Sequence, residues 1–392
     1  AGVDVTGKTV IVALGGPKGM NHPDFDDRNA KFQNVVDQGA TGLILFYPKA
    51  GLLQNVIFNR VHGFLSKSML SVADTSIESF IGLPELKLLL FSKKKFIKKV
   101  FNQNGFNLQK TLNQMEKGKV VSLLLGTSIH CSYTLGNKSL KSKNVVALLP
   151  GSDASLKNEY VVIGAHLDHF GIGKPVKGDS IYNGMMDNAT GVSALLSISK
   201  AFTDNGISPK RSIVFVGYTA EENGLLGSSF FASKNNISDG SIVAKINIDM
   251  LAQTIETVDM APLGYSHSNL SEGADYAAQK LNLKIDNNLE AEKAYIERSD
   301  QISFIRQGIP ALFIAGGFTA EEPKKDAEKV FNKWMKKRYH SPFDDLDQPY
   351  SEIAFLNALK FNFLTVYYLS DRLKKIEWNT NSWLYEKYVL KP

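Results

Sequence analysis

Histidine and carboxylate residues stand at the ends of several apolar segments of this chain, and both residue types bind metal ions. The segment YVVIGAHLDH delivers His166 and Asp168 at its end. Residues two apart on an extended chain point to the same side, so these two side chains are neighbours. A carboxylate in that position accepts the second imidazole N–H of a metal-bound histidine. We therefore interpret His166 as a candidate metal ligand that Asp168 supports.

Carboxylates occupy three further positions of this kind. Asp187 lies in NGMMDNATGVSALL just before a predicted helix, where Asp187 or Asn188 would also make an ordinary N-cap. Glu221 and Glu222 come shortly after the apolar run SIVFVGY, although adjacent glutamates are also common on surface turns. Asp249 ends the run SIVAKINID, where apolar neighbours make an unpartnered carboxylate costly. Each position alone has a structural explanation, and only their shared placement at strand ends indicates a site.

A second histidine, His340, lies in the loop RYHSPFDD after a predicted helix. Ligands of open α/β sheets bind at the carboxyl ends of the strands, so we expect these side chains to meet at one sheet edge. One histidine with three or four carboxylates, joined by a second histidine, offers the nitrogen and oxygen ligands that two metal cations need. One of the carboxylates would bridge the two cations.

The elements that must position these residues are indicated by the apolar pattern of residues 141–392. Strand-like apolar runs alternate with helical segments, and we expect strands at 144–149, 160–165, 211–218, 241–249 and 309–315, with helices near 188–204, 223–235, 268–281, 324–338 and 352–373. Buried strands that alternate with helices are typical of a largely parallel sheet covered on both faces. The sequence therefore predicts a three-layer α/β domain over 141–392 with a central, mostly parallel mixed sheet.

Residues 1–140 have a different character. Apolar runs at 8–15 and 41–46 flank a helical pattern at 29–40, and this part carries no histidine and carboxylate cluster at ligand spacing. These features predict a small, separate α/β domain. The only cysteine, Cys131, excludes an intramolecular disulfide and a thiolate zinc site, and we expect it to be a small buried core residue on a strand.

Five motifs in a fixed order resemble the signature of the zinc-dependent aminopeptidase family. They are GAHLDHFG, NGMMDNATGVSALL, TAEENGLLGS, NIDM and YHSP, within residues 161–343. That family includes secreted bacterial leucine-type aminopeptidases, glutamate carboxypeptidases and glutaminyl cyclases. The segment ERSDQISFIRQGIPALF is similar to the Arg-Ser-Asp stretch of the family. Residues 1–140 resemble the protease-associated domain through GKTVIV, a helix and GATGLILF.

The resemblance implies a three-layer zinc exopeptidase that removes N-terminal amino acids from peptides with a free N-terminus. It implies two zinc ions per chain, with a water that they activate. His166, Asp187 and Asp249 would hold one ion, while Asp187, Glu222 and His340 would hold the other. The remaining implied roles are Glu221 as general base, Tyr339 as donor to the oxyanion, Asp168 as the residue that orients His166, Arg298 as a substrate or product contact, and Asp300 as support for His340.

Two other functions fit the same signature. A glutaminyl cyclase with one zinc ion uses a related site, and a receptor-like binding protein on this fold would have an inactive one. The intact His-x-Asp pair at His166 and the complete set of ligands favour the aminopeptidase. A glutamate carboxypeptidase carries an additional helical dimerisation domain, for which the stretch after His340 is short.

Composition and charge limit the remaining possibilities. Of the 392 residues, 43% are hydrophobic and 21% charged, which is typical of a folded globular protein. No apolar run reaches the roughly 18 residues that a membrane-spanning helix requires. The formal net charge of +6 is concentrated at 93–99 and 324–338, where lysines are expected to face water while Phe96, Val100, Phe331 and Trp334 are buried. We therefore expect no nucleic-acid partner.

The sequence also leads to expectations about the cellular compartment of the protein and about segments that lie outside this chain. We expect a periplasmic or secreted protein whose secretory signal lies outside this sequence. The protease-associated domain is usually inserted within the catalytic domain, whereas this chain begins almost directly in it. We therefore expect an N-terminal part of the catalytic domain to be absent from this chain.

Overall fold

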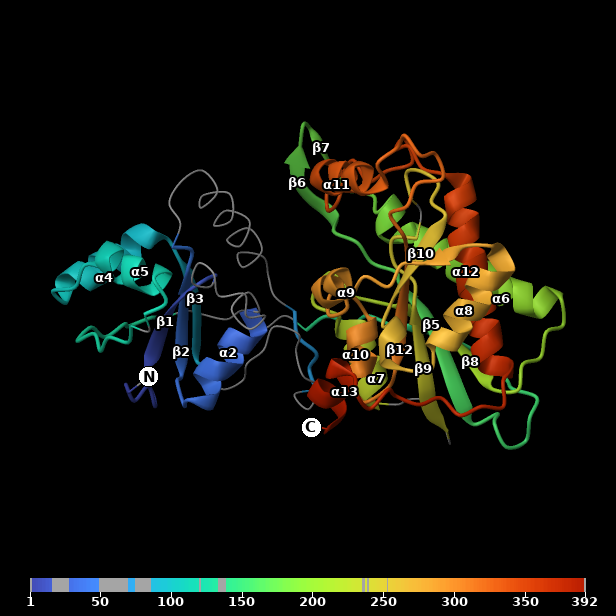
Figure 1. Cartoon of the computed structure of the whole chain (residues 1–392), viewed down its shortest axis with the longest axis horizontal. Coiled ribbons are helices and arrows are strands. Elements are labelled where there is room, and N and C mark those ends of the chain that lie inside the picture. The colour runs from blue at the N-terminus through green and yellow to red at the C-terminus, as the bar shows by residue number, and fades with distance from the viewer. Residues whose placement is uncertain are drawn as a thin grey trace. The chain divides into compact units, whose positions relative to one another are not determined.

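The computed structural model describes residues 2–15, 28–48, 70–74, 86–119, 121–132, 139–234, 237, 240–251 and 253–390. The chain divides into two compact units. The first comprises Ala1–Met69 and Ile81–Ser139, and the second comprises Leu70–Phe80 and Leu140–Pro392. Both units are mixed α/β structures (Figure 1).

The first unit contains a parallel three-stranded sheet in the order β1-β2-β3. Its strands are β1 (Thr9–Ala13), β2 (Gly42–Phe46) and β3 (Leu88–Ser92), and its helices are α2 (Arg28–Asp37), α4 (Lys94–Gln103) and α5 (Leu108–Glu116). Alternate residues of β2 pack on α4 and α5, in a core that contains Ile44, Phe46, Ile97, Phe101, Leu108 and Leu112. The sheet therefore buries one of its faces against these two helices.

Two expectations for this unit are wrong. Phe96 is 45% exposed, because the buried positions of α4 are Ile97, Val100 and Phe101, one turn apart on a face that leaves Phe96 outside. Cys131 is exposed rather than buried. The described residues around it, 121–132, form no strand that could carry its side chain into a core.

The second unit is built on a seven-stranded mixed sheet in the order β11-β10-β12-β9-β5-β8-β4. The strands are β4 (Val145–Leu149), β5 (Glu159–His166), β8 (Ser212–Tyr218), β9 (Ser241–Asn247), β10 (Asp259–Leu263), β11 (Lys284–Ile285) and β12 (Ala311–Gly316). The four central strands β12, β9, β5 and β8 are parallel, while β4 and β10 run antiparallel to their neighbours β8 and β12. The predicted central, mostly parallel mixed sheet is confirmed.

Helices cover both faces of this sheet (Figure 1). On one face lie α6 (Thr190–Asp204), α8 (Ser271–Leu281) and α12 (Glu352–Asp371), and on the other lie α7 (Leu226–Lys234) and α10 (Gln301–Ile305). Successive residues of β5 show why the sheet needs two covers: Val161 and Ile163 pack in the core of the first face, while Val162 packs with Phe231 and Phe304 on the second. This alternation gives the three layers.

The remaining elements of the second unit are short. They are the antiparallel hairpin β6 (Gly171–Val176) and β7 (Asp179–Tyr182), the helical turns η1 (Met185–Ala189) and η2 (Tyr265–His267), α9 (Leu289–Tyr295), α11 (Ala327–Lys337), α13 (Trp383–Tyr385) and η3 (Glu386–Leu390). Trp334 of α11 is buried, as predicted, and the lysines of its last turn are exposed. No helix in the described part of the chain combines the length and apolar character needed to cross a bilayer.

Candidate metal centre

Three of the candidate ligands lie at the carboxyl ends of adjacent parallel strands, while Asp187 lies in the turn η1 and His340 in the loop after α11. β5 ends at His166, and the neighbouring strands β8 and β9 end at Tyr218 and Asn247. His166 pairs in register with Tyr218, so the turn that follows β8 begins beside the imidazole. Because parallel strands end at the same edge of a sheet, Glu221, Glu222 and Asp249 are brought to this edge together.

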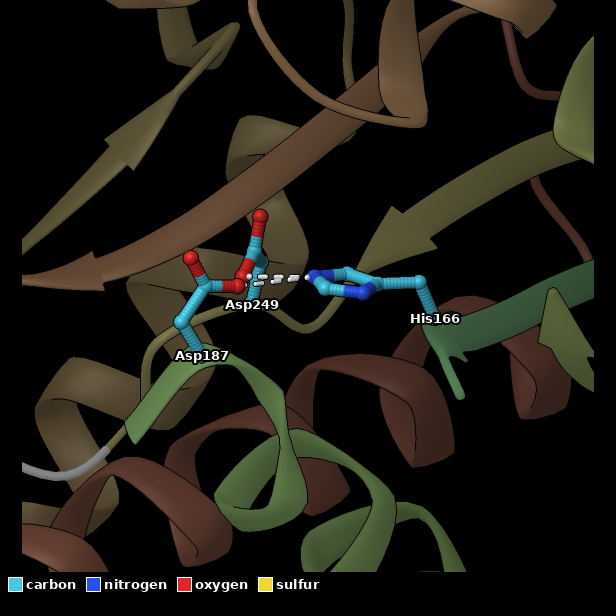
Figure 2. A group of neighbouring side chains, drawn as sticks. All are labelled: His166, Asp187 and Asp249. Carbon is cyan, nitrogen blue, oxygen red and sulfur yellow. Dashed lines mark hydrogen bonds and ion pairs between the residues drawn. The ribbon is translucent and has the colours of Figure 1, made fainter. Parts of the chain in front are cut away.

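The first group of ligands consists of His166, Asp187 and Asp249, all buried. Nε2 of His166 lies 3.2 Å from Oδ1 of Asp187 and 3.3 Å from Oδ1 of Asp249. Figure 2 shows the imidazole pointing at the two carboxylates. Nδ1 of His166 lies 3.0 Å from the backbone carbonyl of Asp168, and this contact orients the ring so that Nε2 faces the carboxylates. Three electron-pair donors that converge on one point are arranged for a cation.

The second group shares Asp187 with the first. Oδ2 of Asp187 lies 3.3 Å from Nε2 of His340, and Oε2 of Glu222 lies 3.4 Å from the same nitrogen. Asp187 therefore presents one oxygen to His166 and the other to His340. A bridging carboxylate between two metal positions needs this disposition. The phenol ring of Tyr339 stacks on the imidazole of His340, with ring centroids 3.7 Å apart.

Burial and neighbouring charges shift the pKa values of the side chains at this site. Burial opposes a charge on His166, yet the carboxylates of Asp249 and Asp187 raise its pKa well above the ordinary value. Burial acts to raise the pKa of Asp187, but hydrogen bonds with His166 and His340 hold it below the ordinary value. Burial raises the pKa of Glu221 well above its usual range and also raises that of Glu222. A divalent cation would replace the protons on the histidines, and imidazole nitrogen with carboxylate oxygen is a donor set that fits zinc.

Asp168 makes different contacts from those expected. Its backbone carbonyl, rather than its carboxylate, contacts the ring of His166. Its carboxylate instead accepts hydrogen bonds from the backbone N–H groups of Glu221, at 3.0 Å, and Glu222, at 3.2 Å. Asp168 thus links the end of β5 to the turn that carries both glutamates.

The turn that carries Asp187 is held by Asp344, which the sequence did not indicate, and by Asn188, which it offered as an N-cap. The buried carboxylate of Asp344 accepts hydrogen bonds from the backbone N–H groups of Met186, at 2.9 Å, and Asp187, at 3.0 Å. The side chain of Asn188 donates to the carbonyl of Ile248 and accepts from the first turn of α6. Asn188 therefore takes the capping role, and the carboxylate of Asp187 is free to face the histidines. The only sequence signal for Asp344 is its place in YHSPFDD, four residues after His340.

In the Arg-Ser-Asp stretch, the direct contact with the site comes from the middle residue. Oγ of Ser299 donates to Oδ2 of Asp249 at 2.7 Å. Arg298 is exposed, with its guanidinium 5.0 Å from the ring centre of Tyr295. Asp300 is fully buried and interacts electrostatically with His166 and with the ammonium of Lys245. A substrate contact for Arg298 and support of His340 by Asp300 stay predictions.

A three-layer α/β unit whose histidine and carboxylate side chains gather at one edge of the sheet is the structure of a protein with a candidate metal centre. The model of peptidase family M28 matches residues 144–363, which is more than half of the chain. The chain belongs to this family, and the expected zinc aminopeptidase relationship is confirmed. The match begins after the first unit, so the protease-associated resemblance of residues 1–140 stays a prediction.

The chain is also similar to individual relatives and to a solved structure. Leucine aminopeptidase 2 of Arthroderma otae is 28% identical over 241 residues, which cover 58% of this chain and 45% of the relative. The probable leucine aminopeptidase 2 of Aspergillus oryzae is 28% identical over 257 residues, which cover 62% of this chain and 48% of the relative. The chain thus spans about half the length of the curated relatives it matches. The aminopeptidase from Aneurinibacillus sp. strain AM-1 superposes with a TM-score of 0.48 at 18% identity, over 96% of this chain and 73% of that one.

Proposed function

We propose that this chain is a zinc-dependent aminopeptidase that removes N-terminal amino acids from peptides. Membership of peptidase family M28 supports hydrolysis of peptides. The observation that carries the two-zinc form of the proposal is the position of Asp187, whose oxygens face His166 and His340 separately. In this proposal His166, Asp187 and Asp249 hold one ion, and Asp187, Glu222 and His340 hold the other.

Zinc at these positions would supply Lewis acidity and lower the pKa of water. Two side chains of the protein would then transfer the proton and stabilise the oxyanion. Glu221 is not among the ligands and lies beside them on the turn after β8, where it would accept a proton from the attacking water and return it to the leaving amine. Burial and the surrounding carboxylates raise the pKa of Tyr339, so its phenol keeps its proton and donates a hydrogen bond to the developing oxyanion.

The excess of carboxylates supports exopeptidase action. Asp187, Glu222 and Asp249 surround the candidate ligand positions, and Glu221 lies beside them. A substrate with a free α-ammonium group is attracted to such a cluster, whereas an internal peptide bond brings no positive charge. A cyclase with one zinc ion is less well supported because both histidine groups are present and share Asp187.

The proposal is tested with a panel of aminoacyl-arylamides and their N-acetylated counterparts. We expect the zinc-loaded protein to release the arylamine from free-amine substrates only. Chelation should abolish the release and zinc should restore it. Equal hydrolysis of the acetylated substrates, or none from any substrate by fully loaded protein, would contradict the proposal.

The roles of the adjacent glutamates are separated by two matched substitutions. Glu221→Gln keeps the shape and removes the base, so we expect turnover to fall about 10²- to 10⁴-fold with zinc content unchanged. Glu222→Gln weakens a ligand, so it should lower the occupancy of one zinc position. Activity assays and elemental analysis measure the two effects. Loss of zinc in Glu221→Gln with full zinc in Glu222→Gln would require the two roles to be exchanged.

A further inference from the structure

A histidine outside the expected ligand set, His169, lies with Asp187 and Glu222 in a group of side chains close enough together to hold one ion. His169 follows His166 by three residues, and its side chain is 7% exposed. Nδ1 of His169 lies 2.7 Å from Oε1 of Glu222. Neither nitrogen of the ring, nor Oε1 of Glu222, has a hydrogen-bond partner within the described residues, so this 2.7 Å approach is the polar contact that the two side chains share. The two side chains are therefore each other's polar partner.

The His169 ring packs against the backbone of the turn that carries Asp187. A Cβ atom on Gly184 would lie 2.8 Å from Cγ of His169, so the ring rests directly on the backbone at this glycine. Gly184 has a φ of +70°, a left-handed conformation that favours glycine, and it stands three residues before Asp187. The ring of His169 is thus seated between the turn that carries Asp187 and the side chain of Glu222.

The contact divides the two oxygens of Glu222 between different partners. Oε1 faces His169, while Oε2 faces His340 at 3.4 Å. A carboxylate that is held through one oxygen presents the other in a fixed direction, and such support of a metal ligand typically changes metal affinity 10- to 100-fold. Without this contact, Glu222 would be free to rotate about its terminal torsion.

We propose that His169 is a positioning residue of the second metal position, where its Nδ1–H holds Oε1 of Glu222 so that Oε2 alone faces the cation. This inference rests on the two-zinc centre proposed above. It adds a residue that acts on the cation through Glu222. His169 and Glu222 lie in the segments that follow the neighbouring strands β5 and β8, so the sheet brings these two segments to the same edge.

The test compares His169→Leu with His169→Asn by competitive zinc titration against a chromophoric chelator. Leucine removes the N–H donor, so we expect one of the two ions to bind about 10- to 100-fold more weakly and the other to be unaffected. Asparagine places an amide N–H near the position of Nδ1, so its affinity should stay within about threefold of the parent. His130→Leu, which removes an exposed histidine of the first unit, is the matched control and should change nothing.

Each outcome decides between defined alternatives. Equal loss of one ion in His169→Leu and His169→Asn would show that the imidazole itself binds the cation and would overturn the positioning role. Unchanged affinity in both would overturn it as well. Thermal melting of the metal-free variants shows whether they fold, and His169→Met replaces His169→Leu if the latter does not. Parent protein that binds a single ion would overturn the two-zinc centre, and this inference with it, whatever the variants show.

Discussion

At the scale of single residues, Asp168 joins two functional segments through one carboxylate. Its two oxygens accept the consecutive backbone N–H groups of Glu221 and Glu222. Ala220, just before them, has a φ of +56°, and this left-handed turn directs both N–H groups to the same side. The candidate base and the candidate ligand are therefore oriented by the same contact.

We expect Asp168→Asn to disturb both glutamates. The amide has one acceptor oxygen and no charge, so one of the two charge-assisted hydrogen bonds is lost, at a cost of about 1 to 3 kcal/mol in unfolding free energy. Peptidase activity should fall more than tenfold, and the zinc affinity of one position should fall with it. Asp179→Asn is the matched control, because Asp179 also accepts a backbone N–H in a turn but lies on the hairpin. An Asp168→Asn protein with parental activity and stability would show that the contact is dispensable.

The sequence could reveal the candidate metal ligands, because their residue types and their positions in the chain already indicate metal binding. His166, Asp187, Glu222, Asp249 and His340 were found from strand ends and a resemblance, and the structure brings all five together. Residues that act through contacts were missed, because the contact exists only in the folded chain. Asp344, for example, binds backbone groups 157 and 158 residues away in sequence.

At the scale of elements, β9 and the start of α10 each bury an ionisable side chain, and the two interact electrostatically. Lys245 of β9 and Asp300, which precedes α10, are both fully buried. The ammonium of Lys245 lies 4.8 Å from the ring centre of Tyr218 and donates to the carbonyl of Ile246. Burial lowers the pKa of Lys245 to about 7 and raises that of Asp300 to about 6. Each charge thus costs free energy in the folded state.

The pKa shifts of Lys245 and Asp300 predict opposite dependences of folding stability on pH. The folded pKa of Lys245 lies below its unfolded value of 10.5, so its penalty is complete below about pH 7 and fades as the pH rises towards 10.5. The folded pKa of Asp300 lies above its unfolded value of 3.8, so its penalty is absent below that pH and complete above about 6.

We therefore expect the metal-free parent protein to become more stable by about 1 to 3 kcal/mol between pH 7 and 9, as Lys245 loses its proton. Metal-free Lys245→Met should not show this increase. The stability of the parent should fall between pH 4 and 6 as Asp300 ionises, and Asp300→Asn should not show this fall. Denaturant unfolding across this pH range measures both, with the exposed Lys329→Met as control. Parallel stability curves for Lys245→Met and the parent would contradict the assignment.

Elements with long apolar runs were predictable, and those without them were not. The five predicted strands correspond to β4, β5, β8, β9 and β12, each of which offers at least five mostly apolar residues in a row. β10 reads DMAPL, with an aspartate and a proline, and β11 has two residues. Both are strands because their neighbours in the sheet supply hydrogen bonds, which no local pattern records. The hairpin of β6 and β7 is largely exposed and carries no buried alternation.

At the scale of the whole molecule, metal removal should affect the two units differently. The second unit would be left with crowded carboxylates, whereas the candidate groups found in the described residues include none in the first unit. A ligand present at about 1,000 times its dissociation constant adds about 4 kcal/mol. Chelation should therefore lower the melting temperature of the second unit by on the order of 10 °C and leave that of the first unchanged.

Differential scanning calorimetry with and without chelator measures this difference. Added zinc should restore the higher transition, whereas added magnesium should not, because the nitrogen ligands suit zinc better. The same melting curve before and after verified metal removal would argue that the histidine and carboxylate groups are not a metal site.

The two histidines that share Asp187 are synthesised at different times. Its two histidine partners, His166 and His340, are 174 residues apart in sequence (340 − 166). Ribosomes add about 5 to 20 residues per second, so His340 is made roughly 9 to 35 s after His166. The first group also needs Asp249, which precedes His340 by 91 residues (340 − 249), so a growing chain contains all of the first group before it contains all of the second. If both are needed for hydrolysis, nascent chains on the same messenger are not exposed to one another's peptidase activity until each has been extended past residue 340.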